Sequence, residues 1–185
     1  MRHCVCVGAP VGCFCPPRDQ VDTYASFFFG PKALPSAGNT ARCKDCTLAI
    51  VKPHAVAEGR MGAILADLMA GSLLVTAFEM FDIDLVAAEE FLEVYKGVLP
   101  EYSDMSTQLA GGRLLAVELV GEDAVHTLRQ SCGPRHVDVA QRIAPETLRA
   151  KHGTDTVRNA VHCTDLDEDG LLECEYFFRI LQSTA

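Results

Sequence analysis

The sequence lacks any apolar segment long enough to cross a membrane. Apolar residues make up 49% of the 185 residues, but charged and polar residues interrupt each run well before the roughly 20 consecutive apolar residues of a membrane-spanning helix. The first 20 residues also lack a basic start, a continuous apolar stretch and a cleavage site, so we expect no secretory signal. These absences argue against membrane and secreted classes, and we expect no membrane among the partners.

The cysteines lack the even count and regular spacing of a disulfide framework. The chain holds nine of them, and the five beyond residue 40 lie among segments that have the pattern of folded elements. Such a set favours free thiols in a reducing compartment. We therefore expect the protein in the cytosol or in a cytoplasmic assembly, with a length that suits one domain and an appendage.

The chain also lacks an excess of positive charge. Its net charge is −9, and residues 1–45 contribute +2 from five basic and three acidic side chains, so the remainder carries −11. A domain this acidic argues against a surface that binds polyanions, and we expect no nucleic acid among the partners. A nucleotide pocket is still allowed, because it needs only a few converging cations.

Residues 1–45 differ from the rest of the chain. They contain two Cys-x-Cys pairs, several prolines and glycines, and one aromatic cluster, at Cys4, Cys6, Cys13, Cys15 and Phe27–Phe29. No helical or strand period persists there, so we predict an extended arm that docks on a partner, because ordering a segment without its own core requires new contacts. Zinc binding or acylation of the pairs is less favoured, since structural zinc sites use wider spacing. Cys43-x-x-Cys46 has such spacing, but without a second pair we interpret it as incidental.

The main domain, residues 46–185, alternates apolar runs with helical periods. Runs typical of strands occupy residues 46–51, 74–81, 114–120 and 157–162. Helical patterns occupy residues 59–71, 86–97, 100–112, 122–132 and 171–181, with a helical turn at 145–151 in a loop-rich stretch and acidic residues in the first turn of the fourth helix. Without the extra turns, this order is the βαββαβ plan of a ferredoxin-like α+β fold, a four-stranded antiparallel sheet with helices over one face.

An isolated histidine, His162, ends the last expected strand. A histidine acts as a nucleophile when one ring nitrogen is unprotonated and exposed and an acceptor holds the other. Glu173, eleven residues later on the next helix, is the candidate acceptor, and Thr164 is placed to orient it. The alternative is a core histidine bonded to a backbone carbonyl, and the residues alone leave both interpretations open.

Phosphoryl transfer also needs cations for the phosphate oxygens. The candidate cations are Lys52, Arg129, Arg149 and Arg158. Each taken alone is typical of a solvated surface charge, but Lys52 closes a buried strand and Arg129 ends a helix that faces the same loop.

Residues 165–170 (DLDEDG) match the first half of a calcium loop. The twelfth position of that loop is Tyr176, where a bidentate glutamate is required, and the preceding residues have a strand pattern. We therefore predict no metal site formed by the protein itself, and interpret Gly170 as a turn before the final helix.

Two motifs, Ile50–Val56 (IVKPHAV) and Arg158–Asp165 (RNAVHCTD), resemble the nucleoside diphosphate kinase family. The resemblance covers residue 46 to the C-terminus and implies the ferredoxin-like plan. It also implies transfer of a γ-phosphoryl group from a nucleoside triphosphate such as ATP to a nucleoside diphosphate, by a ping-pong route through a phosphohistidine, with Mg²⁺ on the phosphates of the bound nucleotide.

The resemblance assigns roles to individual residues. It makes His162 the phosphorylated nucleophile, Glu173 the acceptor on its other ring nitrogen, and Thr164 the replacement of a supporting serine. The nucleotide-binding positions that it implies are Lys52, Arg129 and Arg149 for the phosphates and Asn159 for the sugar hydroxyl.

The chain departs from the family pattern at several of these positions. It has His54 where the family usually has Asp, and Cys163 where it has Gly. The aromatic residue that stacks on the base falls at Glu101 or Tyr102, and a phosphate-contacting threonine falls near Arg135, in a loop some three residues longer. The chain stops soon after the last helix, before the segment with which typical members form hexamers, so we expect no typical hexamer.

Two further segments, Phe91–Gly97 and Asn159–Leu166, resemble a divergent branch of the family tied to centrosomes and ciliary doublet microtubules. Two hypotheses follow. One is a working nucleoside diphosphate kinase that serves nucleotide homeostasis. The other, which we favour, is a structural component inside the doublet microtubules of a flagellar or ciliary axoneme. Its fold can retain the phosphoryl transfer, and its N-terminal arm would bind tubulin and other axonemal proteins.

Overall fold

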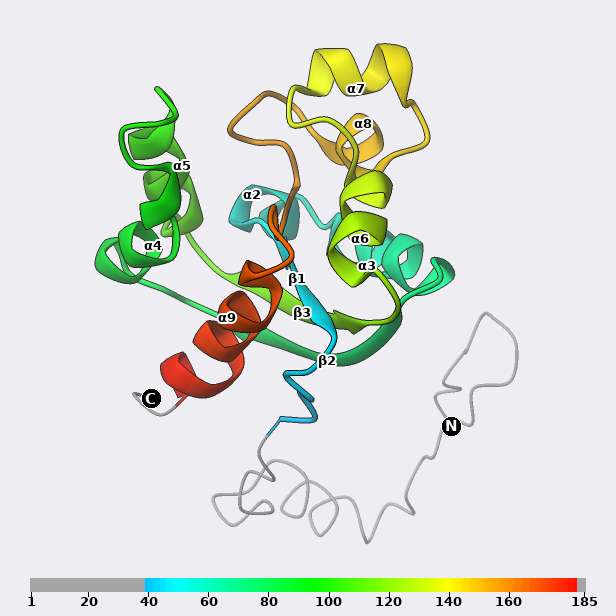
Figure 1. The fold of residues 1–185 in the computed structure, drawn as a ribbon. Helices are drawn as coiled ribbons and strands as arrows, with labels where there is room; N and C mark the ends of the chain where they lie inside the picture. Colours follow the sequence, from blue (N-terminus) through cyan, green and yellow to red (C-terminus); the bar gives the residue numbers. More distant parts are fainter. Residues whose placement is uncertain (1–38, 183–185) are drawn as a thin grey trace, which may run out of the picture. The chain divides into compact units, whose positions relative to one another are not determined.

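The computed structural model describes residues 39–182. Within them, four strands form one antiparallel sheet in the order β2-β3-β1-β4 (Figure 1). The strands are β1 Cys46–Val51, β2 Leu74–Phe81, β3 Leu114–Val120 and β4 Val161–Cys163. The α+β fold with a four-stranded antiparallel sheet is confirmed, and the first three strands have the predicted bounds.

Helices cover both faces of the sheet. One face is covered by α3 Met61–Ala70, α6 Ala124–Cys132 and α8 Leu148–His152, and the other by α4 Leu85–Phe91, α5 Tyr102–Leu109 and α9 Asp169–Glu175. Side chains alternate along β1, so Ala49 and Val51 enter the first core, and Leu48 and Ile50 the second. The expectation of helices over one face was therefore wrong. The unbroken apolar run of β1 is buried on both sides, as in a central strand between two layers.

Several elements differ from the sequence prediction. The pattern did not predict two short helices, α2 Pro53–Ala57 and α7 Val137–Ile143. Proline suits the start of α2, because the first N–H groups of a helix have no intrahelical partner. Acidic residues do not occupy the first turn of α6, since the helix begins only after Asp123, which has a left-handed φ of 47°. A 3₁₀ turn, Glu93–Tyr95, follows α4, and a π-helical segment, Tyr176–Leu181, continues α9.

The strand β4 is shorter than predicted because a turn occupies the residues before it. The Asp155 carboxylate accepts hydrogen bonds from the backbone N–H groups of Val157 (2.9 Å) and Arg158 (2.6 Å). Ala160 has a φ of +68°, which is incompatible with an extended strand. The turn is tied to the end of β1, because the Lys52 N–H donates to the Ala160 carbonyl at 2.9 Å. It therefore brings residues 155–160 beside Lys52.

A buried glutamate joins the segment before β1 to the sheet. Glu118 on β3 is fully buried, and its carboxylate accepts from the backbone N–H groups of Arg42 (2.8 Å) and Cys43 (2.7 Å) and from the Thr76 hydroxyl. These bonds compensate for removing the carboxylate from water. Only residues 39–45 of the predicted arm belong to the described part, and its Cys-x-Cys pairs and aromatic cluster lie outside the described residues.

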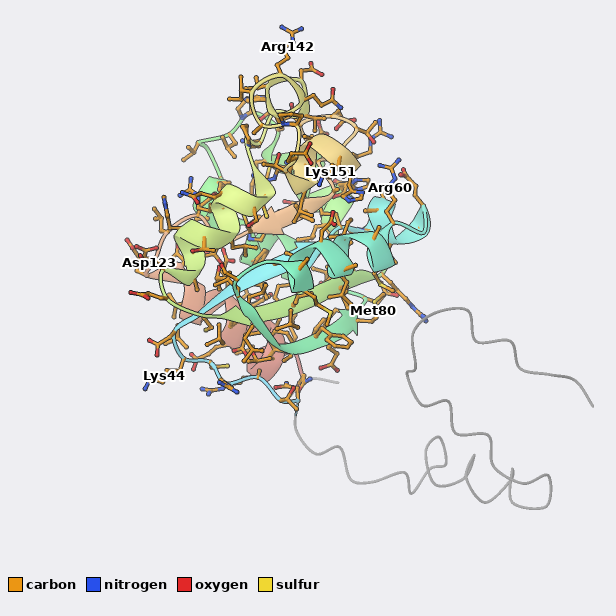
Figure 2. The ribbon with its side chains drawn as sticks, turned by 90° about the vertical axis from the view of Figure 1, so that its right-hand side faces the viewer. Lys44, Arg60, Met80, Asp123, Arg142 and Lys151 are labelled. Carbon is orange, nitrogen blue, oxygen red and sulfur yellow. The ribbon has the colours of Figure 1, made fainter. Side chains whose placement is uncertain are left out.

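The edge strand β2 exposes several apolar side chains. Leu74, Phe78 and Met80 are 55%, 59% and 40% exposed, and Figure 2 shows Met80 at this edge of the sheet. No helix within residues 39–182 combines the length and apolar character needed to cross a membrane.

Candidate active site

His162 lines a cavity of about 240 Å³ that opens beside the ends of β1 and β4. The two strands pair antiparallel, with His162 opposite Ile50, and Lys52 follows β1 directly. Segments far apart in the chain are thereby brought to one edge of the sheet. Of the predicted site residues, the cavity brings together Lys52, Arg135, Arg149, Asn159 and His162.

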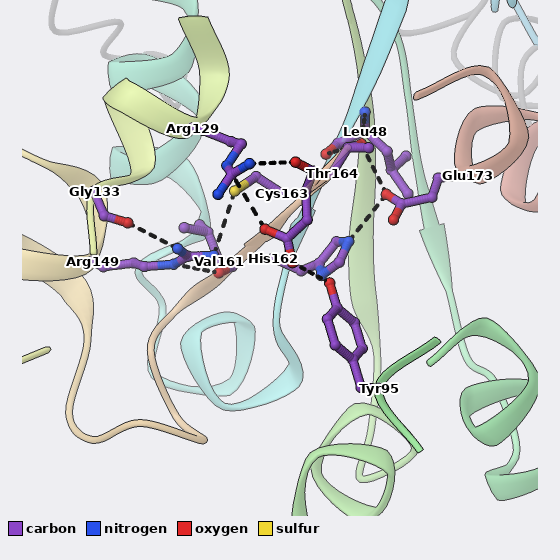
Figure 3. A network of polar contacts seen from close by, with 11 residues as sticks. Leu48, Tyr95, Arg129, Gly133, Arg149, Val161, His162, Cys163, Thr164 and Glu173 are labelled. Atoms are coloured by element: carbon purple, nitrogen blue, oxygen red, sulfur yellow. Dashed lines mark hydrogen bonds and ion pairs between the residues drawn. The ribbon is translucent and has the colours of Figure 1, made fainter. Parts of the chain in front are cut away.

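A carboxylate holds one nitrogen of the His162 ring. The distance from His162 Nε2 to Glu173 Oε2 is 3.1 Å, and the Thr164 hydroxyl donates to the same oxygen at 2.9 Å (Figure 3). The Leu48 N–H donates to the Thr164 hydroxyl oxygen at 3.1 Å, which fixes Thr164 against β1. With the carboxylate as acceptor, Nε2 carries the ring proton, so Nδ1 keeps a free lone pair.

Aromatic side chains enclose the imidazole. The ring of Phe91 packs edge-on against His162, with centroids 5.1 Å apart and an interplanar angle of 71°. Tyr95 lines the cavity and donates its hydroxyl to Asp165. Burial and this hydrogen bond raise the pKa of Tyr95, so its hydroxyl remains a donor. No role was predicted from the sequence for Phe91 or Tyr95, although their spacing of four residues in a helical pattern places them on one side of the chain.

The cavity also contains a buried lysine. Lys52 is 6% exposed, and its Nζ donates to the Val157 carbonyl at 2.9 Å. Burial, together with the nearby Arg149 and Arg135, lowers the pKa of Lys52 to about 7. Within residues 39–182 no salt bridge joins Lys52 to a carboxylate, and the nearby Cys163 and Asp155 offset only part of the lowering of its pKa. An incoming phosphate would supply the missing negative charge.

Arg149 is held rigidly behind the strand that carries His162. Its Nε donates to the Val161 carbonyl (3.2 Å), one terminal nitrogen to the Gly133 carbonyl (2.9 Å), and the other to the Cys163 sulfur (3.5 Å). Burial by itself would lower the pKa of Arg149, but the Cys163 and Cys132 thiols keep it above its usual value. The Arg149 guanidinium is therefore a permanently charged group that lines the cavity.

Arg129 and Arg135 complete the cationic side. Arg135 lines the His162 cavity and forms an ion pair with Glu101 at 3.0 Å. Arg129 instead lines an adjoining cavity that shares Arg135, Arg149 and Asp165 with the first. Its guanidinium contacts both the carbonyl and the carboxylate of Asp165, and half of its side chain is exposed. Arg129 is thus a neighbour of the site, connected to it through Asp165.

Asn159 lines the cavity and has a side-chain oxygen that no described group satisfies. The residue is 3% exposed, and its side-chain N–H₂ donates to the Arg135 carbonyl at 3.3 Å. Its Oδ1 is buried and has no hydrogen-bond partner within residues 39–182. A buried acceptor of this kind is costly unless a ligand satisfies it, and a hydroxyl group has the donor required.

Three residues that the sequence singled out lie outside the His162 cavity. Tyr102 donates its hydroxyl to the Glu89 carbonyl (3.1 Å) and does not line the cavity, whose apolar wall is instead formed by Tyr95, Val98 and Leu99. His54 Nδ1 lies 3.0 Å from the Gln108 amide, and Arg158 pairs with Asp155 at the surface. Tyr102 is therefore not positioned to stack on a base in this cavity.

Cys163 is buried between the cavity and the first core. It is 2% exposed and belongs to the apolar cluster that contains Cys132 of α6. A hydrogen bond from the Cys132 thiol lowers the pKa of Cys163 to about 6, and the Arg149 guanidinium acts in the same direction against the effect of burial. Both effects favour the thiolate form of the Cys163 sulfur, which contacts the Arg149 guanidinium.

The side chains of the cavity fit a metal ion that arrives with a nucleotide. Among the described residues that line the His162 cavity, Asp165 is the one carboxylate, and it already accepts from Tyr95 and contacts Arg129. Mg²⁺ keeps several waters and is commonly bound through one or two carboxylates and substrate phosphates. The donor set therefore suits Mg²⁺ held mainly by phosphate oxygens, with Asp165 as the protein group within reach.

Comparison with known proteins agrees with this geometry. The family model described as nucleoside diphosphate kinase matches residues 45–182. The mouse protein "Nucleoside diphosphate kinase homolog 7" is 45% identical over 168 residues, which cover 88% of this chain and 42% of the relative. The rat protein of the same name is 47% identical over 155 residues, which cover 81% of this chain and 39% of the relative. The chain thus spans about two fifths of the length of these two relatives.

Shorter relatives are matched almost in full. The nucleoside diphosphate kinase of Aquifex aeolicus is 33% identical over 136 residues, which cover 74% of this chain and 95% of that protein. A crystal structure of the Aquifex aeolicus enzyme superposes with a TM-score of 0.70 at 33% identity, over 74% of this chain and 96% of the other. Because the family model matches residues 45–182, which include Lys52 and His162, the chain belongs to the nucleoside diphosphate kinase family.

Proposed function

We propose that this protein transfers a γ-phosphoryl group from a nucleoside triphosphate to a nucleoside diphosphate through a phosphohistidine at His162. The observation that carries the proposal is the 3.1 Å contact between His162 Nε2 and Glu173, beside a cavity that also contains Lys52 and Arg149. Family membership supports nucleoside diphosphate kinase chemistry in general, and the preserved histidine, carboxylate and cations support it for this chain.

The contact with Glu173 determines which nitrogen reacts. Nδ1 of neutral His162 attacks the γ-phosphorus, a nitrogen–phosphorus bond forms, and the bond to the β,γ-bridging oxygen breaks. The nucleoside diphosphate leaves with that electron pair. The ring becomes positively charged as it bonds to phosphorus, and the Glu173 carboxylate beside Nε2 stabilises that charge. In the second half-reaction a different nucleoside diphosphate takes the phosphoryl group and restores the neutral ring.

The cations of the cavity bind and orient the phosphates. Lys52 and Arg149 line the same cavity as His162, in an enclosed site where electrostatic interactions are strong. Mg²⁺, when bound with the nucleotide, neutralises phosphate charge and polarises the phosphorus–oxygen bond. The Asn159 Oδ1 accepts a sugar hydroxyl, and the apolar wall at Val98 and Leu99 receives the base.

Phosphotransfer between two nucleotides tests the proposal. The purified protein is incubated with γ-labelled ATP, Mg²⁺ and GDP, and labelled GTP is measured at several fixed GDP concentrations. We expect parallel double-reciprocal plots, as for a ping-pong route, and no transfer by His162→Ala. His126→Ala is the matched control, because His126 is exposed on α6 and does not line the His162 cavity. Absence of label in GTP with the wild type refutes the proposal.

We further propose a structural role in the flagellar or ciliary axoneme, within the cytoplasm and cytoskeleton, in which residues 1–45 dock on tubulin or another doublet-microtubule protein. The identity of 45% and 47% to the mouse and rat homolog 7 supports membership of a divergent branch of the family. The exposed apolar side chains of the edge strand β2, Leu74, Phe78 and Met80, support contact with a partner protein.

Deletion of the arm tests the structural role. Protein lacking residues 1–38 retains the whole described domain, including the contacts of Arg42 and Cys43 with Glu118. We expect the full chain to remain on isolated axonemes after salt washing and the shortened chain to be released. Equal retention of both chains contradicts docking through the arm, and absence of the full chain from axonemes contradicts the axonemal role.

A further inference from the structure

Arg149 is buried without a carboxylate partner. The residue is 9% exposed, its three hydrogen bonds end on two carbonyls and the Cys163 sulfur (Figure 3), and within residues 39–182 it forms no ion pair with Asp or Glu. A buried charge is strongly destabilising unless it is paired. The Cys163 sulfur, at 3.5 Å, is the group in the described domain that can supply negative charge in direct contact.

A second thiol lies behind the first. Cys132 at the end of α6 is fully buried, and the Cys132 and Cys163 thiols interact, so that each shifts the pKa of the other in the opposite direction. Both residues are free cysteines in the same apolar cluster. The two thiols therefore differ in character: the pKa of Cys163 is lowered and the pKa of Cys132 is raised, which favours negative charge on the sulfur that contacts Arg149.

The cavity gives small molecules access to only one of these sulfurs. Cys163 lines the same cavity as His162 and Arg149, whereas Cys132 does not line it. A small oxidant that enters the cavity therefore meets the Cys163 thiolate first, and the thiolate is the reactive form of cysteine.

We propose that Cys163 and Cys132 are an oxidisable thiol pair, which a peroxide converts to a disulfide and thereby removes the counter-charge of Arg149. This inference rests on the proposed phosphotransferase function, because Arg149 acts on the phosphates of the nucleotide. The chemistry follows from the arrangement of Cys163 and Arg149 on one cavity, with Cys132 behind Cys163 in the same apolar cluster.

The steps balance with one molecule of peroxide. The Cys163 thiolate attacks one peroxide oxygen, the O–O bond breaks, and a sulfenic acid and a hydroxide form; the hydroxide is protonated to water. The Cys132 sulfur then attacks the Cys163 sulfur, and the sulfenic oxygen leaves as a second water with the Cys132 proton. Two thiols are oxidised by two electrons, and a thiol reductant reverses the reaction by disulfide exchange.

The disulfide changes the phosphate site through Arg149. A disulfide sulfur carries no charge, so the guanidinium loses its anionic partner and turns toward another acceptor, and the cavity loses a fixed cation. Loss of one such group from a phosphoryl-transfer site lowers the rate by about 10²-fold. The reduced protein is therefore the active form and the oxidised protein the inactive one.

Peptide mapping combined with phosphotransfer tests the pair. Trypsin releases Cys132 in residues 130–135, but places Cys163 and Cys174 together in residues 159–179. The Cys174→Ala variant removes this ambiguity and also serves as the control, because Cys174 lies in the other core beside Cys46. The full chain is treated with hydrogen peroxide, mapped without reduction, and assayed for transfer from ATP to GDP before and after dithiothreitol.

We expect a Cys132–Cys163 peptide in both wild type and Cys174→Ala, with a loss of about 10²-fold in phosphotransfer that dithiothreitol restores. Cys132→Ser keeps a hydroxyl donor to Cys163 but cannot close the disulfide. It should be active when reduced, with a melting temperature that confirms its fold, and it should not recover fully after prolonged peroxide, because the unprotected sulfenic acid oxidises further.

Three outcomes overturn the inference: no linked peptide in the wild type, a linked peptide with unchanged phosphotransfer, or full recovery of Cys132→Ser together with an unmodified Cys163. An inactive protein before any oxidation, with dithiothreitol present, instead refutes the proposed phosphotransferase function, so the two failures are distinguishable. In that case the linked peptide alone still decides whether the thiol pair forms.

Discussion

Replacing Lys52 by methionine should stabilise the fold, and the gain should be larger at pH 6 than at pH 9. Lys52 is 6% exposed, and burial beside Arg149 and Arg135 lowers its pKa from 10.5 to about 7. Between these two pKa values the unfolded chain binds a proton that the folded protein does not. The stability of the wild type therefore rises with pH across this window, and the penalty for burying Lys52 is greatest below pH 7.

The size of the effect follows from the two pKa values. A pKa unit corresponds to about 1.4 kcal/mol, so a fall from 10.5 to about 7 gives a full penalty of about 5 kcal/mol at low pH. At pH 9 most of the window has been crossed, and the penalty is smaller by about 2 to 3 kcal/mol. The variant also loses the hydrogen bond from Nζ to the Val157 carbonyl, about 1 kcal/mol, at both pH values.

Urea unfolding at pH 6, 7.5 and 9 measures this difference. The free energy of unfolding of Lys52→Met minus that of the wild type should fall by about 2 to 3 kcal/mol from pH 6 to pH 9. Lys44→Met is the control, because Lys44 is exposed (Figure 2), and its difference from the wild type should not vary in this way. A difference for Lys52→Met that is constant with pH, or that grows toward pH 9, would refute a buried, weakly basic Lys52.

Three further substitutions test other contacts. Glu173→Gln should slow phosphotransfer to GDP by about 10²-fold in a steady-state assay, because an uncharged amide stabilises the phosphorylated ring poorly; an unchanged rate contradicts the role of this carboxylate. Glu118→Gln should lower the free energy of unfolding by about 2 kcal/mol in urea, since its N–H₂ would face donors that now bind a carboxylate oxygen. Gly133→Ala should lower the melting temperature, because Gly133 has a φ of +77° and a Cβ there would lie 2.3 Å from the Thr147 hydroxyl oxygen. Gly62→Ala, where a Cβ meets nothing within 4 Å, is the control and should leave the melting temperature unchanged or raise it.

The strands could be predicted because their signal is local. Apolar runs bounded by turn residues gave β1, β2 and β3 their bounds. The start of β4 could not be predicted in this way. The turn at Asp155 and the positive φ of Ala160 depend on hydrogen bonds, which an apolar sequence pattern does not reveal. The helices themselves were predicted, but their division between the two faces of the sheet was not, although the unbroken apolar run of β1 is the pattern of a strand buried on both faces.

The reacting residues of the site could be predicted from residue types, but several residues that line its cavity could not. His162 and Glu173 are eleven residues apart, and one turn from strand to helix brings them into contact. Tyr95 reaches the cavity from a distant segment of the chain, so only the folded chain shows that it, and not Tyr102, lines the site. Cys163 is recognisable in the sequence as a departure from the family pattern, whereas its contact with Arg149 depends on the packing of α8 near β4.

Direct identification of the phosphorylated atom tests the central claim, that His162 carries the phosphoryl group. The protein is mixed with γ-labelled ATP and Mg²⁺ without an acceptor nucleotide, digested at alkaline pH, and mapped by mass spectrometry. We predict one acid-labile phosphate on Nδ1 of His162, none in Glu173→Gln at short times, and prompt loss of the label when GDP is added. A label on another residue, or a label on His162 that GDP does not remove, would contradict this claim.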